Sequence, residues 1–551
     1  SSLARSSKKE AFRDFYHGYF RFLAFLSTSA FFLLRSHHVT GGKGLPTRNG
    51  RLVWGCKNST PPNPMSLHAS PHADVAVTWP GICYNAIFVG GMIAWFTLAG
   101  LSYLKYLETG NAAELLDTSI GTVGMKLFLT AMVLELLIAS LPFFNQRGKR
   151  PIYRGSDSLC SIAMGTLQQI FDACLTALAP FPLYNAIPYT YIFDNYRLVS
   201  LSGWTGFFGM LLVRDFLYYW FHRSAHRVAL LWAVHSVHHR PSEYNFTVNL
   251  AQPVIQTMAS ALFYWPLALF FPVELYLLVK PLENTWGFFS HTRLVGNGLP
   301  FLQYIFVTPS FHRVHHACAP AHYLDSNYGE MFSIWDWMFR TAVLEKEEPT
   351  WGLTTPTSSW DPLQAQYIVF WQLFCKARQA GSWMDACWWV WVMPPGWDVK
   401  TRQEIDYPRP QTPETSPIYC AQLKRVPLVL GTVHLLSIML FGYVMLPRLK
   451  SLSLLEVLCH GAFIVASLQC LGQYLDGKSH SWWSTAIMGP VAALYFYLAG
   501  LFLPNVLRMG LTVLTIIKIY PLHRSWEPVP LESRWMMANG APIRVEQHKI
   551  E

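Results

Sequence analysis

Histidine spacing places the strongest constraint on how this chain folds. One pair is four residues apart and two triplets have the spacing i, i+3, i+4, and these clusters are His222/His226, His235/His238/His239 and His312/His315/His316. Side chains with such spacing lie on one face of a helix, and neutral imidazole is the commonest protein ligand for metals. The fold therefore has to bring eight imidazoles to bound metal.

The number of histidines favours two metal ions. A single zinc ion takes four protein ligands at most, and a catalytic zinc ion takes three. Imidazole binds zinc, copper, iron and nickel, so the ligand type alone leaves the metal open. A zinc protease is excluded because His222-Arg-Ser-Ala-His226 lacks the glutamate of the HExxH motif. A haem held between spans would instead take one histidine from each of two helices.

The composition indicates a membrane protein. Hydrophobic residues make up 52% of the chain and charged residues 13%, too little charge to cover a water-facing surface. We expect an all-α integral membrane protein, a multi-span bundle of about eight to ten helices with the histidines at the cytoplasmic ends of the central ones. The predicted spans are Tyr19–Leu34, Cys83–Leu104, Met125–Phe144, Gly203–Phe221, Val254–Val279, Val426–Leu446, Leu454–Leu475, Thr485–Leu503 and Val506–Ile519, with Leu159–Leu178 as an amphipathic interfacial helix.

The net charge of +10 is explained by loops beside the spans rather than by nucleic-acid binding. Arg147, Lys149, Arg150 and Arg154 form a basic loop that the positive-inside rule places on the cytoplasmic side. No basic stripe with exposed aromatic residues is present, which argues against a nucleic-acid partner. The basic start of the chain (Arg5, Lys8, Lys9 and Arg13) before an apolar stretch predicts a signal anchor or first span.

Composition changes along the chain predict five regions. An extension with one or two spans covers residues 1–115, and the catalytic region with the histidine clusters covers 116–345. A Trp- and Pro-rich connecting region follows at 346–425, then C-terminal membrane helices at 426–520 and a polar tail at 521–551. No internal repeat is visible.

Further motifs accompany the histidines. They are Asp215-Phe-Leu-Tyr-Tyr-Trp-Phe-His222-Arg-Ser-Ala-His226, Trp232-Ala-Val-His235-Ser-Val-His238-His239, Glu243-Tyr244-Asn245, Thr308-Pro-Ser-Phe-His312-Arg-Val-His315-His316, Asn327-Tyr328, Trp335-Asp336 and Trp351-Gly-Leu-Thr354. On a chain with several apolar spans, this series resembles the fatty acid hydroxylase/sterol desaturase superfamily and, within it, the alkylglycerol monooxygenases. The likeness runs from about residue 120 to about residue 520.

The resemblance implies a non-haem di-iron monooxygenase of the endoplasmic reticulum membrane. Its implied substrate is an alkylglycerol, hydroxylated by O₂ at the alkyl carbon next to the ether oxygen, giving a fatty aldehyde and glycerol. Tetrahydrobiopterin is the implied reductant, and a pterin-recycling reductase is a possible partner besides membrane lipids. We expect apolar spans around the site to let an alkyl chain enter from the bilayer.

The resemblance also extends the list of site residues. His291 stands where the superfamily supplies a further ligand, which makes nine with the eight clustered histidines, whereas His322 is not expected to be one. Asp215 and Asp336 are candidate acceptors of a hydrogen bond from a ligand imidazole. The alternative for Asp215 is an ion pair with Arg214, or that these two neighbours face different partners.

Two departures from the family pattern and two competing functions stay open. Arg227 occupies a position that is acidic in the animal ether-lipid enzymes, and Arg340 one that is commonly glycine in the superfamily. One alternative function is a sterol or fatty acyl hydroxylase or desaturase that takes electrons from cytochrome b5. The other is a metal-binding membrane transporter or scaffold. Transporters place polar groups in mid-span, whereas these histidines group at span ends, which favours catalysis.

Overall fold

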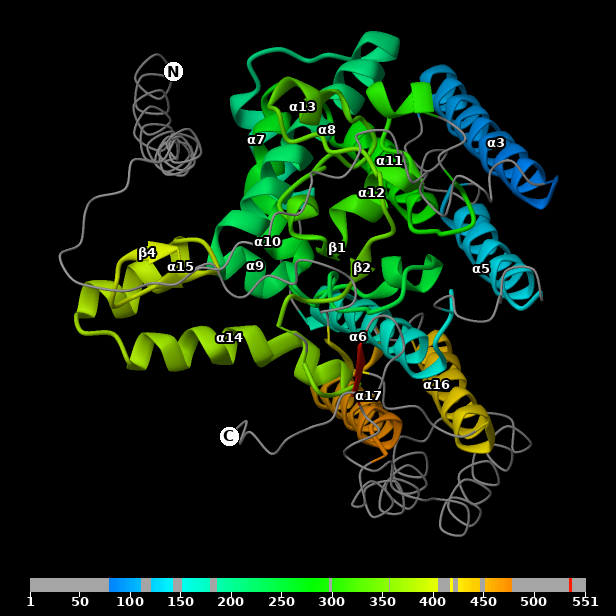
Figure 1. Ribbon diagram of the computed structural model, residues 1–551. Helices are drawn as coiled ribbons and strands as arrows, with labels where there is room; N and C mark the ends of the chain where they lie inside the picture. Colours follow the sequence, from blue (N-terminus) through cyan, green and yellow to red (C-terminus); the bar gives the residue numbers. More distant parts are fainter. Residues whose placement is uncertain are drawn as a thin grey trace, which may run out of the picture. The chain divides into compact units, whose positions relative to one another are not determined.

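The part of the chain that this computed structural model describes belongs to one compact unit, His68–Glu551. The described residues are 79–110, 120–141, 151–178, 186–296, 300–355, 357–404, 417–419, 425–445, 451–477 and 535–537. They are mainly helical, as Figure 1 shows, which confirms the predicted helical class.

The helices vary widely in length. The α-helices are α3 (Trp79–Thr109), α5 (Ile120–Ala139), α6 (Gly155–Leu178), α7 (Ala186–Tyr196), α8 (Gly203–Arg227), α9 (Ala229–His235), α10 (Gln256–Tyr264), α11 (Val273–Ser290), α12 (Pro309–His315), α13 (Ile334–Met338), α14 (Pro362–Arg378), α15 (Val390–Val392), α16 (Arg425–Met445) and α17 (Leu454–Leu475). Short 3₁₀ turns are η2 (Phe246–Leu250), η3 (Trp265–Leu269), η4 (Pro300–Tyr304) and η5 (Ala321–Tyr323), and η6 (Asp385–Trp389) is a π-helical turn.

Three two-stranded antiparallel ladders accompany the helices and were not predicted. They are β1 (Ala317–Ala319) with β2 (Thr350–Trp351), β3 (Trp397–Asp398) with β4 (Gln403–Glu404), and β5 (Pro417–Tyr419) with β6 (Trp535–Met537). The first ladder places Ala317 opposite Trp351. It therefore fixes the chain that directly follows the last histidine cluster.

Several predicted spans coincide with helices. The predicted bounds of α17 match those observed, and α3, α5, α8 and α16 overlap the other predicted spans in their regions. Among the described residues, α17 is the one helix long and apolar enough to cross a membrane, and Phe128–Ala139 is a shorter apolar helix. The predicted spans Tyr19–Leu34, Thr485–Leu503 and Val506–Ile519 lie outside the described residues.

The prediction of a single span over Val254–Val279 is wrong. The chain there forms α10, then η3 with Pro266 in its first turn, then α11, which begins after Pro272. Proline has no backbone N–H and its ring clashes with the preceding helical turn. The two prolines therefore divide an apolar stretch that hydropathy alone reads as one helix.

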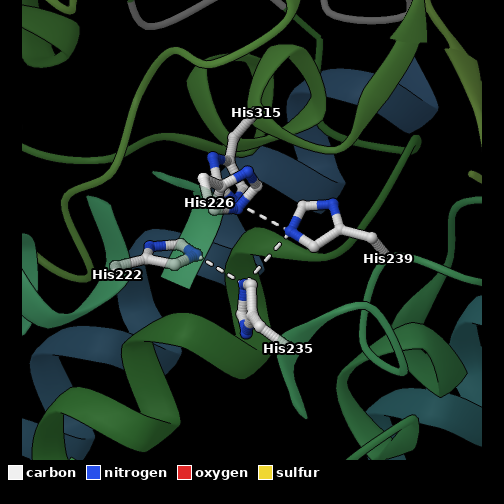
Figure 2. Close-up of side chains that lie close together, drawn as sticks. All are labelled: His222, His226, His235, His239 and His315. Carbon is white, nitrogen blue, oxygen red and sulfur yellow. Dashed lines mark hydrogen bonds between the residues drawn. The ribbon is translucent and has the colours of Figure 1, made fainter. Parts of the chain in front are cut away.

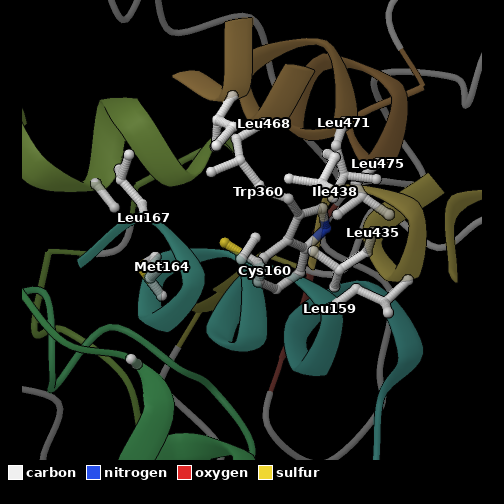
Figure 3. Packing of buried hydrophobic residues seen from close by; sticks show 14 of the residues in the cluster. Leu159, Cys160, Met164, Leu167, Trp360, Leu435, Ile438, Leu468, Leu471 and Leu475 are labelled. Atoms are coloured by element: carbon white, nitrogen blue, oxygen red, sulfur yellow. The ribbon is translucent and has the colours of Figure 1, made fainter. Parts of the chain in front are cut away.

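Side chains of α6, α16 and α17 form one hydrophobic core, drawn in Figure 3. Buried residues of α6 lie on one face, including Cys160, Met164 and Leu167, as the amphipathic pattern of that helix predicts. Trp360 fills the space beside α17, and α14 begins directly after it at Pro362. The Asp361 side chain caps α14 by accepting a hydrogen bond from the Leu363 N–H at 2.9 Å.

A second core surrounds α8 and α11 and holds the helices that carry the site. Met210 and Leu211 of α8 are buried in this cluster with Leu275 and Leu278 of α11. Gly206 permits the close approach of α8 and α11, because a Cβ atom there would lie 2.9 Å from Cδ1 of Leu275. The packing fixes where the far ends of α8 and α11 lie.

Gly472 of α17 provides a test of the packing between α17 and the start of α14. A Cβ atom at this position would lie 2.5 Å from Cα of Asp361, so Gly472→Ala is expected to destabilise the protein by about 1–3 kcal/mol through overpacking. The measurement is thermal unfolding in detergent.

Gly461→Ala on the same helix is the matched control, since its Cβ atom would meet only Cys174 Sγ at 3.7 Å. That variant is expected to be neutral or slightly more stable, because alanine has the higher helix propensity. Equal melting temperatures for the two variants would contradict the packing argument.

Candidate metal centre

Four segments bring the histidines together. His222 and His226 lie in the last two turns of α8, which ends at Arg227 because the next residue, Val228, has extended backbone. His235 ends α9, and His238 and His239 follow in the next turn. His291 is the residue directly after α11. The third cluster lies on α12, which Thr308 caps by accepting a hydrogen bond from the Phe311 N–H at 3.3 Å.

All nine histidines predicted as ligands gather in two groups. In each group, one nitrogen from every ring lies within 4.8 Å of the others. The first, called the five-histidine group, contains His222, His226, His235, His239 and His315, and is drawn in Figure 2. The second, called the four-histidine group, contains His238, His291, His312 and His316.

The nitrogen separations match those of ligands around an ion. In the five-histidine group, His235 Nε2 lies 2.9 Å from His222 Nε2 and 3.2 Å from His239 Nε2. In the four-histidine group, His291 Nε2 lies 3.1 Å from both His312 Nε2 and His316 Nε2. Two nitrogens bound at about 2.1 Å to one ion lie about 3.0 Å apart at 90° and about 3.4 Å apart at a tetrahedral angle.

The two HxxHH motifs are shared between the groups in a reciprocal way. The first and last histidines of one motif, His235 and His239, join the five-histidine group together with the middle histidine of the other, His315. Conversely, His312 and His316 join the four-histidine group together with His238. The i, i+4 pair of each motif therefore serves one group, while the i+3 histidine reaches the other.

Backbone carbonyls orient the rings. Nδ1 of His222 lies 2.9 Å from the Tyr328 carbonyl oxygen, and Nδ1 of His315 lies 2.8 Å from that of Ser326. Nδ1 of His291 likewise lies 2.6 Å from the carbonyl oxygen of Gly287. A carbonyl only accepts, so Nδ1 carries the hydrogen and the Nε2 lone pair points into the group.

Asp336 acts on this geometry through the backbone. Its carboxylate accepts hydrogen bonds from the N–H groups of Tyr328 at 2.8 Å and Gly329 at 2.9 Å, and from the Thr341 hydroxyl at 2.7 Å. Among the described contacts, its carboxylate accepts no hydrogen bond from an imidazole. It holds instead the peptide whose carbonyl oxygen receives the His222 hydrogen bond.

Backbone conformation in the same loop explains one departure from the family pattern. Arg340 has φ +59°, as does Asn327, and the left-handed region favours glycine. A glycine is therefore the natural residue at position 340. The arginine there keeps the turn that returns the Thr341 N–H to the carbonyl oxygen of Asp336, at 2.8 Å.

Asp215 also holds backbone rather than an imidazole. It accepts hydrogen bonds from the Met331 N–H at 2.8 Å and the Trp335 indole N–H at 2.7 Å. Arg214 instead pairs with Glu283 and with Glu330, the latter at 3.5 Å. Of the two alternatives for this neighbouring pair, the structure shows residues that face different partners.

A buried polar network surrounding the four-histidine group escaped the sequence reasoning. Thr292, next to His291, donates a hydrogen bond to Glu135 of α5 at 2.5 Å. Arg313, between His312 and His315, binds Glu345 and donates to the Thr292 carbonyl oxygen at 2.9 Å. Two sequence features could have indicated this network: the arginine inside the HRVHH motif and the lone glutamate in the apolar α5.

Arg154, a residue of the predicted basic loop, lies directly before α6. It is buried there and pairs with Glu243 at 2.7 Å. The other three residues predicted for that loop (Arg147, Lys149 and Arg150) lie outside the described residues.

Burial keeps the ligand imidazoles neutral. It lowers the pKa of His238 to about 4 and that of His315 to about 3, although the carbonyl hydrogen bond at Nδ1 acts in the opposite direction. Burial also raises the pKa of the Asp336 carboxyl group to about 6. At neutral pH the histidines therefore offer free lone pairs, which metal binding needs.

A cavity of about 590 Å³ reaches the five-histidine group. His226, His239 and His315 border it, and Arg227 lines it as well. The Arg227 guanidinium group pairs with Asp325 at 2.9 Å and with Glu404 at 3.2 Å. The second departure from the family pattern therefore places a cation between two carboxylates at the cavity wall.

Comparisons with known proteins agree with this site. The model of the Fatty acid hydroxylase family matches residues 207–341. Alkylglycerol monooxygenase from Homo sapiens is 31% identical over 67% of this chain and 80% of its own length. The alkylglycerol monooxygenase from Xenopus tropicalis is 38% identical over 45% of this chain and 53% of its own length. The one from Caenorhabditis elegans is 30% identical over 64% of this chain and 71% of its own length.

No solved structure matches the chain. The family match spans both HxxHH motifs and the loop that holds their rings. The identity to the human alkylglycerol monooxygenase extends over four fifths of that protein's length, well beyond the residues that the family model matches. The chain belongs to the alkylglycerol monooxygenase family of fatty acid hydroxylase proteins.

Proposed function

We propose that this protein is a membrane-bound di-iron monooxygenase that hydroxylates alkylglycerols with O₂ and tetrahydrobiopterin. The observation that carries the proposal is the pair of histidine groups, which converge nine neutral imidazoles on two centres. The three relatives described above are named alkylglycerol monooxygenase, and these names supply the substrate class and reaction type of the proposal.

The chemistry of the donors supports iron. A monooxygenase needs an ion that changes oxidation state, which zinc does not do, and imidazole suits iron among the redox-active metals. The five-histidine group and the four-histidine group would each hold one ion. Bound there, the two ions would supply O₂ activation and the attack on an unactivated C–H bond.

The protein's own residues prepare and shield the site. The carbonyl oxygens of Ser326, Tyr328 and Gly287 hold the ligand rings in the tautomer that binds metal. Asp336 and Asp215 act as positioning residues, because they fix the loop segments that carry or adjoin those carbonyls. The cavity beside the five-histidine group gives a substrate access to one side of the centre.

The products follow from the carbon that is attacked. Hydroxylation of the carbon next to the ether oxygen gives a hemiacetal, which collapses to a fatty aldehyde and glycerol. One oxygen atom of O₂ enters the lipid and the other leaves as water, with two electrons supplied by the tetrahydropterin.

The proposed setting is the endoplasmic reticulum membrane, with several spans and the histidine groups on the cytoplasmic side. Support comes from the apolar helix α17, which is long enough to cross a bilayer. It also comes from the apolar composition of the whole chain.

Metal analysis combined with turnover tests the proposal. The purified protein is expected to carry two iron ions and to cleave an alkylglycerol with a tetrahydropterin as reductant. Turnover that requires NADH with cytochrome b5 instead would contradict the pterin assignment and favour the sterol or fatty acyl alternative.

Two histidine variants test the ligand assignment. His291→Ala and His315→Ala each remove one ligand from a different group, so each is expected to lose at least one metal ion and all activity. His434→Ala is the control, because its ring lies 3.1 Å from the Ser467 carbonyl oxygen within the C-terminal helices. Loss of metal in that control would mean that the site is misplaced.

Asp336→Asn tests positioning through the backbone. The amide keeps the shape but loses one acceptor oxygen, so at least one of the buried Tyr328 and Gly329 N–H groups loses its partner, at a cost of about 1–3 kcal/mol. We expect faster metal release, measured with a chelator, and a lower kcat. Asp398→Asn, in the exposed turn where Asp398 accepts from the Thr401 N–H at 2.8 Å, should leave both unchanged.

The lowered histidine pKa values predict a pH dependence for the metal-free protein. Between the folded pKa of about 4 for His238 and the unfolded value of about 6.5, the unfolded chain binds more protons. Stability is therefore fully present above about pH 6.5 and falls as the pH decreases, by roughly 1.4 kcal/mol per pH unit for each such histidine. Thermal unfolding from pH 8 to pH 5 measures this, and His238→Ala should flatten the slope.

A further inference from the structure

One face of α14 carries a row of exposed aromatic side chains. Tyr367, Trp371 and Phe374 follow the spacing i, i+4, i+7 and are 55%, 54% and 45% exposed. Arg378 is also exposed and lies eleven residues after Tyr367, on the same face. We call the face formed by the three aromatic residues and Arg378 the aromatic stripe. The rings of Trp371 and Phe374 lie 5.6 Å apart, and an exposed apolar patch of this kind marks an interaction site. Beyond α14, Trp383 is 73% exposed as well.

The opposite face of α14 lines the cavity that reaches the five-histidine group. Gln372 and Lys376 border this cavity with Leu373. At 100° per residue these positions lie across the helix from the aromatic stripe. Leu373 also packs against Ala229 and Ala233 of α9, the helix that ends at His235. The helix α14 is therefore the wall between the cavity and whatever covers the stripe.

The start of α14 adjoins the end of the membrane-spanning candidate α17. Asp476, directly after α17, accepts hydrogen bonds from the Ser359 hydroxyl at 2.6 Å and the Trp360 N–H. Gly472 lets Asp361 and Pro362 approach the last turn of α17 closely. Figure 1 shows α14 running away from this junction toward α15. Because a spanning helix ends at the bilayer boundary, α14 begins at that level.

The charges of α14 suit the same boundary. The helix contains no acidic residue, and its last turn carries Lys376 and Arg378. Tryptophan and tyrosine concentrate where lipid headgroups meet the acyl chains, and basic residues add attraction to anionic lipids.

We infer that α14 lies in the plane of the bilayer surface with its aromatic stripe among the lipid headgroups. The occupant of the stripe is the lipid bilayer itself. The helix then separates the headgroup layer from the cavity, so a membrane-dissolved molecule passes along one side of α14 to reach the five-histidine group.

Photo-crosslinking of the full chain in nanodiscs tests the contact without relying on activity. The photoreactive residue p-benzoylphenylalanine replaces Trp371, and the discs contain phosphatidylserine with alkyne-tagged phosphatidylcholine. Irradiation is expected to give a lipid adduct at position 371.

The matched control is the same substitution at His322. Its side chain is 56% exposed but pairs with Glu347 in a polar loop, so it should give no lipid adduct. Equal lipid labelling at both positions, or no lipid adduct at 371, would overturn the inference. An adduct to a protein in native membranes, in place of lipid, would show a protein partner and would overturn it as well.

A kinetic test addresses entry along α14, and this part rests on the proposed function. Trp371→Glu combined with Phe374→Glu places two charges in the headgroup layer. We expect the KM for an alkylglycerol in bilayers to rise roughly tenfold with little change in kcat. Trp371→Phe with Phe374→Trp is the conservative control and should retain the original KM.

A short-chain, water-soluble alkylglycerol separates the possible outcomes. The charged variant is expected to turn it over like the unmodified protein. An equal loss for both substrates would contradict entry along α14. Failure of the unmodified protein on every alkylglycerol would refute the proposed function instead, while the lipid adduct at position 371 would still stand.

Discussion

The convergence of nine imidazoles in two groups, with neighbouring ring nitrogens of eight of them 2.9–3.3 Å apart, is the constraint on which the rest of the structure depends. Buried polar nitrogens without partners are costly, and within the described part of the chain Nδ1 of His235, Nδ1 of His312 and Nε2 of His226 have no hydrogen-bond partner. A ring whose Nε2 is to meet a common ion can be held from behind at Nδ1, and this is the case for His222, His238, His291 and His315. Around the centre, the structure supplies that support mainly through backbone carbonyls.

Because backbone carbonyls hold these rings, the loops that carry the carbonyls must themselves be held in place. The loop after η5 presents Ser326 and Tyr328 to two ligand rings, and Asn327 between them donates to the Phe311 carbonyl oxygen at 2.8 Å. Asp336 holds this loop by accepting hydrogen bonds from the N–H groups of Tyr328 and Gly329. Burial raises the pKa of its carboxyl group to about 6. Asp336 therefore shapes peptide groups rather than contacting an imidazole, and the grouped histidines remain neutral.

The sequence predicted which histidines gather far better than it predicted the contacts that hold them in place. Spacing and ligand chemistry identified eight histidines, and the family resemblance added His291; all nine gather. How the HxxHH motifs divide between the groups was out of reach, because it depends on the relative placement of α9 and α12. The roles expected for Asp215 and Asp336 missed their backbone partners, since a hydrogen bond to a peptide N–H leaves no pattern in side chains. Helices such as α17 were predictable because hydropathy alone defines them.

The wrong span over Val254–Val279 shows how local backbone chemistry sets the site. Pro272 starts α11, and the eighteen residues of that helix carry the chain about 27 Å to His291. His291 follows the last residue of α11, and its Nε2 lies 3.1 Å from Nε2 of both His312 and His316. The prolines that interrupt the apolar pattern thus set where η3 and α11 begin. Hydropathy measures only the transfer of side chains into lipid. It therefore does not detect that a proline lacks the backbone N–H that a continuous helix needs.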